Sequence, residues 1–301
     1  MPTVEIVEVS PRDGLQNEKI AVSTENKVAL ILRAIEAGAK RIEAASFVLP
    51  RAVPQMADGA EVVARLRERN DLADVALIGL ALNARGAERA LAAGVDEINF
   101  AVCATESFNQ RNQNAAVAAT MGEFSKAAAM AKSAGKRVSL TIAVAFGCPF
   151  EGEVDPARVR ALAEEGDAWG AFEIGIADTI GVADPYAVER LMADVRDTIG
   201  GAPLRLHFHN TRNTGYANAF AALRAGAASL DSSIGGIGGC PFAPNATGNI
   251  ATDDLVYMLG RMGVETGYDL GRLIDTAAWL KDTCGLSPPS LLPKAGAFPA
   301  G

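Results

Sequence analysis

The stretch LRLHFHNTRNTGYANAF, residues 204–220, holds the only two histidines of the chain. Leucine and phenylalanine alternate there with His207 and His209, which predicts a buried strand that ends at the second histidine. Side chains two apart on a strand point to the same face, so both imidazoles should face the same way. Two such imidazoles suit a metal ion. However, two partly exposed histidines can be present without a bound metal. A motif this short indicates a metal site only where the rest of the sequence supports one.

Strand and helix patterns alternate along most of the chain. The apolar runs predict eight strands, at 3–10, 41–47, 74–81, 96–102, 137–145, 171–177, 203–209 and 228–234. The helical patterns between and after them predict eight helices, at 25–38, 59–69, 85–93, 115–134, 156–168, 184–199, 214–225 and 252–263. Because right-handed crossovers cover the outside of a parallel sheet, eight such units predict a closed (β/α)8 TIM barrel. An extra C-terminal helix is expected at 269–285.

An open doubly wound sheet is the alternative fold. It would be expected to carry a glycine-rich dinucleotide turn after an early strand, and this sequence has none there. No second domain, linker or low-complexity segment is evident. We therefore expect a single domain over 1–301, with an irregular tail from about residue 287.

The composition argues against several classes of partner. The formal net charge is −8, the sequence pI is about 5.0 and the basic residues are scattered, which does not fit binding to nucleic acid or to an anionic membrane surface. No apolar run approaches the roughly 18 residues of a membrane span, and no secretory apolar segment precedes the first strand. The four cysteines are far apart, as expected of reduced thiols. We expect a cytoplasmic protein.

Polar, reactive residues collect where the predicted strands end. In a TIM barrel the catalytic groups lie at the carboxyl ends of the strands. Besides the two histidines, the candidate residues at these ends and in the glycine-rich loop 235–249 are Arg12, Asp13, Glu43, Asp178, Cys240 and Asn249.

Asp13 and the two histidines would form a set of one carboxylate and two imidazoles. Such a nitrogen and oxygen set suits Mg²⁺ or Mn²⁺, and the same arrangement also serves zinc or non-haem iron. A fourth ligand could be the amide oxygen of Asn249 or the carboxylate of Glu43. The ion would let an acidic protein bind an anionic hydroxy acid by chelation through its hydroxyl and carboxylate groups.

Arg12 and Cys240 are the candidate catalytic residues beside this ion. The guanidinium could stabilise a developing enolate oxygen, or it could pair with Glu43 or Asp178 as structural support, and both can hold together. Cys240 lies in GGIGGCPFAPNATGN, whose glycines would let a loop carry a proton donor or acceptor over a substrate. We favour this role for Cys240 and a packing role for the other three cysteines.

Four motifs identify a family resemblance. VSPRDGLQNE, IEAASFVLPRAVPQMAD, ADTIGVADP and GGIGGCPFAPNATGNIATDDLVYML resemble the 3-hydroxy-3-methylglutaryl-CoA lyases, metal-dependent TIM-barrel lyases that share an Arg-Asp pair at the first strand. The similarity covers essentially the whole chain, and the last motif is long enough to be specific. It implies retro-Claisen cleavage of 3-hydroxy-3-methylglutaryl-CoA to acetyl-CoA and acetoacetate, in leucine degradation, by a homodimer without an organic cofactor.

The resemblance also implies a role for each candidate residue. The implied metal ligands are Asp13, His207, His209 and Asn249, and the implied catalytic residues are Arg12, Asp13, Glu43, Asp178, His207 and Cys240. The metal would lower the pKa of the substrate's tertiary hydroxyl, and His207 or Asp13 would remove its proton. Arg12 would then hold the acetyl-CoA enolate, and Cys240 would deliver a proton to its carbon.

One segment departs from the family pattern. Lyases of this type usually continue the double histidine as His-Asp-Thr-Tyr-Gly-Gln, whereas this chain continues with Asn210, Thr211 and Arg212. The loop also reads CPFAP where CPYA is commoner. Arg212 could contact a substrate carboxylate or be a solvated loop residue. The reaction type is unaffected, but the substrate could be a related hydroxyacyl-CoA such as citramalyl-CoA.

Two further functions fit parts of the pattern. Claisen-type synthases for isopropylmalate or homocitrate share the Arg-Asp and His-x-His marks, but they usually carry an additional C-terminal region, and here only a short helix and tail follow the barrel. A non-catalytic acyl-CoA-binding barrel would be expected to have lost a metal ligand or the loop thiol. This sequence retains all of them, which favours the lyase.

Overall fold

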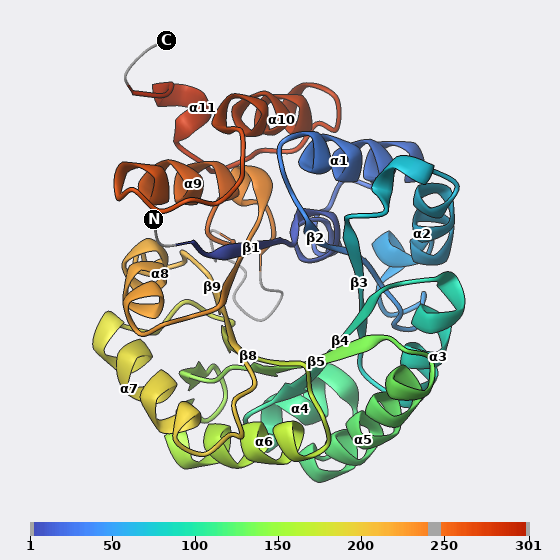
Figure 1. The fold of residues 1–301 in the computed structure, drawn as a ribbon, viewed down its shortest axis with the longest axis vertical. Helices are drawn as coiled ribbons and strands as arrows, with labels where there is room; N and C mark the ends of the chain where they lie inside the picture. The colour runs from blue at the N-terminus through green and yellow to red at the C-terminus, as the bar shows by residue number, and fades with distance from the viewer. Residues whose placement is uncertain (1–2, 240–247, 299–301) are drawn as a thin grey trace.

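The strands form a closed barrel in the computed structural model, which describes residues 3–239 and 248–298. Eight parallel strands close in the order β1-β10-β9-β8-β5-β4-β3-β2, which confirms the predicted (β/α)8 fold (Figure 1). The ring closes because β1 pairs with both β10 and β2. The barrel strands are β1 (Glu5–Glu8), β2 (Arg41–Ser46), β3 (Ala76–Ala81), β4 (Glu97–Cys103), β5 (Arg137–Ala143), β8 (Glu173–Asp178), β9 (Leu204–Phe208) and β10 (Ser229–Ser232).

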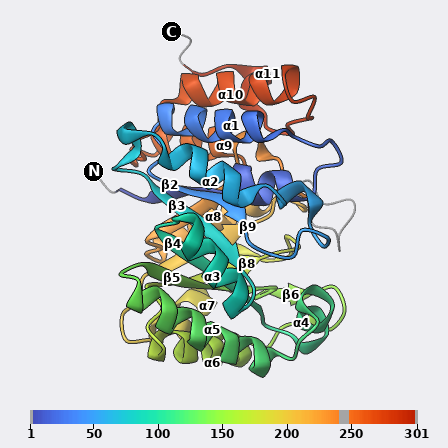
Figure 2. The ribbon, with the colours of Figure 1, turned by 90° about the vertical axis from the view of Figure 1, so that its right-hand side faces the viewer.

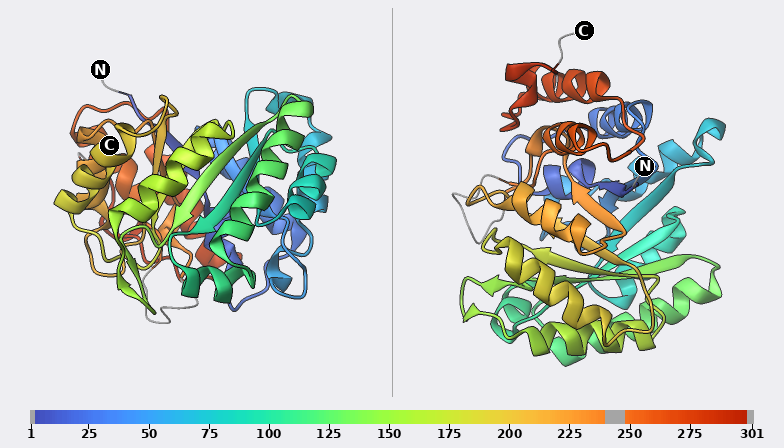
Figure 3. Two further views of the ribbon diagram at one scale, coloured as in Figure 1. Left: turned by 90° about the horizontal axis from the view of Figure 1, so that it is seen from below. Right: turned by 60° about the vertical axis from the view of Figure 1, so that its left-hand side comes forward.

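Helices enclose the strands from outside (Figures 1 and 3). The outer helices are α1 (Thr24–Glu36), α2 (Gly59–Arg67), α3 (Ala84–Ala93), α5 (Val117–Ser133), α6 (Pro156–Ala168), α7 (Pro185–Arg196), α8 (Gly215–Arg224) and α9 (Thr252–Arg261). The start of α7 shows why they begin where they do. The Asp184 carboxylate accepts hydrogen bonds from the N–H groups of Tyr186 and Ala187, and Pro185 occupies the first helical position.

The extra C-terminal helix is present as α10 (Leu270–Asp282), which packs across α1 and α9 (Figure 2). A short helix, α11 (Leu292–Ala295), lies in the segment that was expected to be irregular. Among the described residues, no helix is long and apolar enough to cross a membrane.

Three local features were not predicted. The helix α4 (Glu106–Gln113) has the polar sequence ESFNQRNQ, so no apolar periodicity reveals it. A small antiparallel hairpin of β6 (Gly147–Cys148) and β7 (Gly152–Glu153) follows β5. The first strand is also shorter than the predicted 3–10, because the chain turns at Ser10 into a single π-helical turn, η1 (Ser10–Gly14).

The barrel interior is polar, whereas branched aliphatic residues usually fill a TIM barrel. The main apolar core lies between the strands and the helices, and a separate apolar cluster contains only Val7, Val9 and Ile78. Arg41 donates two hydrogen bonds to Glu97 and two to Glu173, at 2.6 to 3.0 Å. All three side chains are buried. A buried ion network therefore joins β2, β4 and β8 inside the barrel.

Replacing Arg41 should destabilise the fold strongly. Arg41→Met leaves the buried carboxylates of Glu97 and Glu173 without their bidentate partner, which typically costs about 3–5 kcal/mol. We expect the free energy of unfolding, measured by urea titration with circular dichroism, to fall by about this amount. The control Arg65→Met removes an exposed arginine from surface ion pairs, which should cost only about 0–1 kcal/mol. Equal losses in the two variants would contradict a structural role for the interior network.

Candidate active site

Asp13 reaches the mouth of the barrel through the turn η1. The N–H groups of Arg12 and Gly14 both donate to the carbonyl oxygen of Val9, so the turn folds back onto the end of β1. Gly14 is required by close packing, because a Cβ there would lie 2.9 Å from Cγ1 of Ile237. The turn therefore places Asp13 at the carboxyl end of the barrel, where the sequence analysis expected it.

The two histidines meet Asp13 at this end. His207 on β9 and His209 just beyond it have ring centroids 5.1 Å apart. The candidate ligand atoms of Asp13, His207 and His209 all lie within 4.8 Å of one another. Residues from distant parts of the chain are thus brought close enough to share one ion. We refer to these three residues as the ligand cluster.

Asn249 joins the ligand cluster because the segment around it pairs with the end of β9. An antiparallel bridge links Asn249 to His209, and the N–H of Asn210 donates to the carbonyl oxygen of Gly248. The Nδ2 group of Asn249 donates to Oδ2 of Asp13 at 2.8 Å. This contact fixes the amide beside the two imidazoles.

Two atoms at the site are buried and lack a hydrogen-bond partner among the described residues: Oδ1 of Asn249 and Nδ1 of His209. Buried polar atoms without a partner are uncommon and call for an explanation. Both atoms can donate a lone pair, and together with a carboxylate and a second imidazole they form a mixed oxygen and nitrogen set. The residues present therefore fit a divalent cation.

The charge states of the ligand cluster also suit a cation. Burial alone would raise the pKa of Asp13, but the Arg12 guanidinium and the two imidazoles outweigh it and hold this pKa well below its usual range. Burial and the neighbouring His207 lower the pKa of His209 to about 4. At neutral pH, Asp13 is therefore ionised and His209 offers a lone pair.

Arg12 is held between two carboxylates. Its Nε donates to Oε2 of Glu43 at 2.6 Å, and its Nη1 donates to Oδ1 of Asp13 at 2.6 Å. The other oxygen of Glu43 accepts a hydrogen bond from Nδ2 of Asn99 at 2.8 Å. Both oxygens of Glu43 are engaged in this way, so Asn249 is the better candidate for the fourth ligand. Glu43 instead orients the guanidinium.

Asp178 holds the loop that follows β8. Its carboxylate accepts hydrogen bonds from the N–H groups of Val182 and Ala183, at 2.9 and 3.0 Å. Burial raises its pKa, although these hydrogen bonds act in the opposite direction. Among the described residues, the ion pairs of Arg12 are with Asp13 and Glu43, so Asp178 supports the mouth through the loop backbone.

Arg212 fixes the same loop from the neighbouring segment. Its Nη1 donates to the carbonyl oxygens of Ile180 and Gly181, at 2.9 and 3.0 Å. It also lines a cavity of about 380 Å³ together with Tyr216 and Asn249. The side chain therefore has a defined structural contact and lines the same cavity as a candidate metal ligand.

Cys240 lies outside the described residues, and the described ends of its loop lie beside the ligand cluster. Gly238 has a φ of 108°, and a Cβ there would lie 2.7 Å from Nδ2 of Asn249 and 2.9 Å from the carbonyl oxygen of Asp13. At the other end, a Cβ on Gly248 would lie 2.7 Å from the carbonyl oxygen of Gly238. The three other cysteines, Cys103, Cys148 and Cys284, are free and buried, as expected of packing residues.

The sequence analysis missed Asp231. This residue lies on β10 in register with His207, and its Oδ2 is 3.1 Å from Nδ1 of the imidazole. Burial lowers the pKa of His207, but the hydrogen bond with Asp231 and the charge of Asp13 outweigh it and raise this pKa. The sequence did contain one signal that could have pointed to Asp231, namely that it is a single carboxylate in the middle of the predicted buried strand 228–234.

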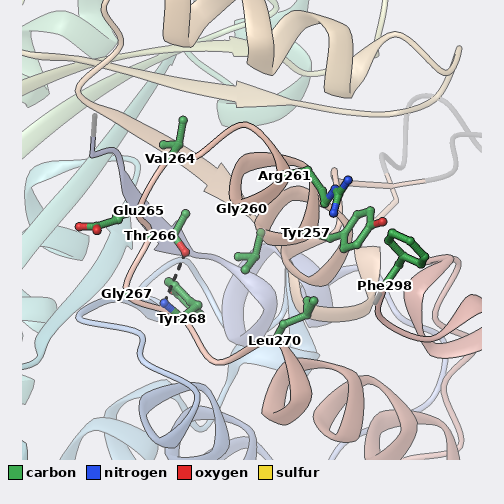
Figure 4. Close-up of a pocket in the computed structure, with 11 residues that line it drawn as sticks. Tyr257, Gly260, Arg261, Val264, Glu265, Thr266, Gly267, Tyr268, Leu270 and Phe298 are labelled. Atoms are coloured by element: carbon green, nitrogen blue, oxygen red, sulfur yellow. Dashed lines mark hydrogen bonds between the residues drawn. The ribbon is translucent and has the colours of Figure 1, made fainter. Parts of the chain in front are cut away.

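A second cavity, of about 590 Å³, lacks the imidazole and thiol groups that mark the candidate active site. Its lining includes Tyr257, Arg261, Glu265 and Phe298 (Figure 4). Glu265 forms a bridge with Thr3, just before β1, so this cavity lies toward the amino end of the barrel, opposite Asp13. Its lining residues include neither an imidazole nor a thiol, so we assign the chemistry to the other end.

Comparisons with known proteins show the family of this chain. A family model described as HMGL-like matches residues 3–280. The chain is 46% identical to the (R)-citramalyl-CoA lyase of Chloroflexus aurantiacus, over 98% of this chain and 96% of that protein. It is 40% identical to the mitochondrial hydroxymethylglutaryl-CoA lyase of Gallus gallus, over 92% of each.

Solved structures show the same relationship. An HMG-CoA lyase from Acinetobacter baumannii, in complex with coenzyme A and 3-methylmalate, matches with a TM-score of 0.94 at 39% identity, over 99% of this chain and 97% of that one. The lyase of Pseudomonas aeruginosa matches with a TM-score of 0.92 at 40% identity, over 98% of each. The resemblance seen in the sequence is confirmed, and the chain belongs to the HMGL-like family.

Proposed function

We propose that this protein is a metal-dependent lyase that cleaves 3-hydroxy-3-methylglutaryl-CoA to acetyl-CoA and acetoacetate by retro-Claisen chemistry. The observation that carries the proposal is the convergence of Asp13, His207 and His209 beside a fixed arginine at the carboxyl end of the barrel. Relatives with this named activity cover nearly the whole chain. The products would place the protein in leucine degradation.

The proposed cofactor is Mg²⁺ or Mn²⁺. Asp13, His207, His209 and the amide oxygen of Asn249 would hold it, and the remaining positions would be open to the substrate. When bound, such an ion polarises the hydroxyl oxygen of the substrate and lowers the pKa of that hydroxyl. The buried Oδ1 of Asn249, which has no hydrogen-bond partner within residues 3–239 and 248–298, supports this ligand set over one that includes Glu43.

The chain's own residues would carry the proton and charge movements. Of the two candidate bases, Asp13 takes the proton of the tertiary hydroxyl, because both ring nitrogens of His207 are engaged when Nδ1 contacts Asp231 and Nε2 holds the ion. The carbon-carbon bond then breaks as the alkoxide becomes a ketone. Arg12 stabilises the enolate of acetyl-CoA. Because Glu43 and Asp13 already hold its guanidinium, little reorganisation is needed when the charge develops.

Cys240 would deliver the final proton to the enolate carbon. The support is the position of the loop ends, since Gly238 packs against Asp13 and Asn249. The carbonyl oxygen of Gly239, the residue before the thiol, accepts a hydrogen bond from Nδ2 of Asn17 at 2.8 Å. A loop anchored in this way begins beside the reacting groups.

A second candidate substrate is (R)-citramalyl-CoA, and two observations favour it. A lyase named for this compound is 46% identical to the chain. In addition, Arg212 stands where lyases of the first type usually have tyrosine. Both substrates carry a tertiary hydroxyl and a thioester, and they differ by one methylene before the free carboxylate. One methylene typically changes kcat/KM by about 10 to 200-fold, so the two activities can be separated.

One prediction of the proposed function concerns the substrate and the metal. Protein stripped of metal with EDTA should cleave neither thioester, and adding Mg²⁺ or Mn²⁺ should restore cleavage. The two kcat/KM values should differ by about 10 to 200-fold. Acetoacetate as the preferred product supports the first substrate, and pyruvate supports the second. If the metal-loaded protein cleaves neither compound, the lyase proposal is wrong and a non-catalytic binding role is favoured.

Another prediction of the proposed function concerns the loop thiol. Cys240→Ser replaces the thiol by a much weaker acid and should lower kcat by about 10²–10⁴-fold, the usual contribution of a positioned acid or base. Binding of Mn²⁺ should not change, because the thiol is not in the ligand set. The control Cys284→Ser alters a cysteine near the end of α10 and should keep the wild-type kcat. A wild-type kcat for Cys240→Ser would exclude the thiol from proton transfer.

We also propose that residues 1–301 act as one lyase domain in a cytoplasmic homodimer. The pairing of β1 with β10 supports a single unit, because the barrel closes between its first and last strands. Light scattering of the purified protein would give its mass in solution.

A further inference from the structure

A chain of buried groups leads from the ligand cluster into the barrel. Oδ2 of Asp231 lies 3.1 Å from Nδ1 of His207, and its Oδ1 lies 3.6 Å from Nε of Arg205. Asp231 is 6% exposed and Arg205 is 2% exposed. These charges are largely out of water, where their interaction is stronger than at the surface.

The contact between Asp231 and His207 bears on which ring nitrogen can bind a metal. A neutral imidazole has an N–H donor at one nitrogen and a lone pair at the other. A carboxylate beside Nδ1 accepts a hydrogen bond from it and keeps the proton there. The lone pair is then at Nε2, on the other side of the ring. Histidines that bind metals commonly donate their second nitrogen to a carboxylate in this way.

Arg205 holds Asp231 in place, because its Nε lies 3.6 Å from the carboxylate oxygen that does not face His207. The guanidinium is itself fixed, because its Nη2 donates to Oγ1 of Thr141 at 2.9 Å and its Nε lies 3.5 Å from Oε2 of Glu173. Asp231 therefore faces the imidazole on one side and an immobilised cation on the other.

We propose that Asp231 is a positioning residue that holds His207 in the Nδ1–H tautomer and directs its Nε2 into the ligand cluster, with Arg205 as the counter-charge. The position of β10 suits this task, since it lies between β9, which carries His207, and β1, which leads to Asp13. The inference rests on the proposed metal site and does not depend on which thioester is cleaved.

Metal titration of the metal-free protein tests the proposal. Asp231→Ala should weaken Mn²⁺ binding, measured by calorimetry, by about 10–100-fold, the usual effect of removing such a partner. The matched control is Ser229→Ala on the same strand and face, whose hydroxyl donates to Glu173 at 2.8 Å. It should bind Mn²⁺ like the wild type. Wild-type affinity in Asp231→Ala would overturn the proposal.

Two further variants distinguish the loss of the Asp231 contact from a general loss of the fold. Asp231→Ala removes one of the carboxylates that face Arg205, so the double variant Asp231→Ala/Arg205→Met removes both members of this ion pair and should still show weakened binding. Asp231→Asn keeps an oxygen that can accept from Nδ1–H, and it should recover part of the lost affinity. Wild-type affinity in the folded double variant, or no recovery in Asp231→Asn, would count against a positioning role.

A second readout needs no metal. Because the chain has only two histidines, long-range ¹H–¹⁵N spectra of ¹⁵N-histidine-labelled protein should resolve both imidazoles. At a pH where both are neutral, His207 should be in the Nδ1–H tautomer, and Asp231→Ala should convert it to a mixture. An unchanged tautomer in Asp231→Ala would overturn this inference alone. A wild-type protein that shows the tautomer but binds no Mn²⁺ would instead overturn the proposed function.

Discussion

An excess of buried negative charge inside the barrel is the constraint on which the rest of the structure depends. Three guanidinium groups face five carboxylates there: Arg12, Arg41 and Arg205 against Asp13, Glu43, Glu97, Glu173 and Asp231. Taken at formal charge, this leaves two negative charges, which one divalent cation would neutralise. Uncompensated buried charge costs several kcal/mol per ion. The proposed ion would therefore stabilise the fold while it activates the substrate.

The sequence predicted those parts of the site that depend on local patterns. Alternation along one strand was enough to place His207 and His209 on one face, and the order of strands and helices was enough to place Asp13 near them. Pairing between distant segments was not predictable in the same way. The bridge that brings Asn249 to His209, and the register that sets Asp231 opposite His207, depend on how β9, β10 and the loop end fit together.

In the proposed function, reaction type and substrate choice would depend on different residues. The ligand cluster and Arg12 would supply the groups for the proposed retro-Claisen cleavage, and their arrangement is fixed by buried contacts. Arg212 lies outside that set. It holds the carbonyl groups after Asp178 and lines a cavity next to Asn249. If the substrate enters this cavity, a change at Arg212 would alter the shape and charge around it without disturbing the ligand cluster.

Anomalous diffraction from crystals grown with Mn²⁺ would test the central claim most directly, because it locates the ion without relying on turnover. The account predicts one strong peak in contact with Asp13, His207 and His209, with the amide oxygen of Asn249 beside it. A fully occupied Mn²⁺ elsewhere, or none at these three side chains, would contradict it.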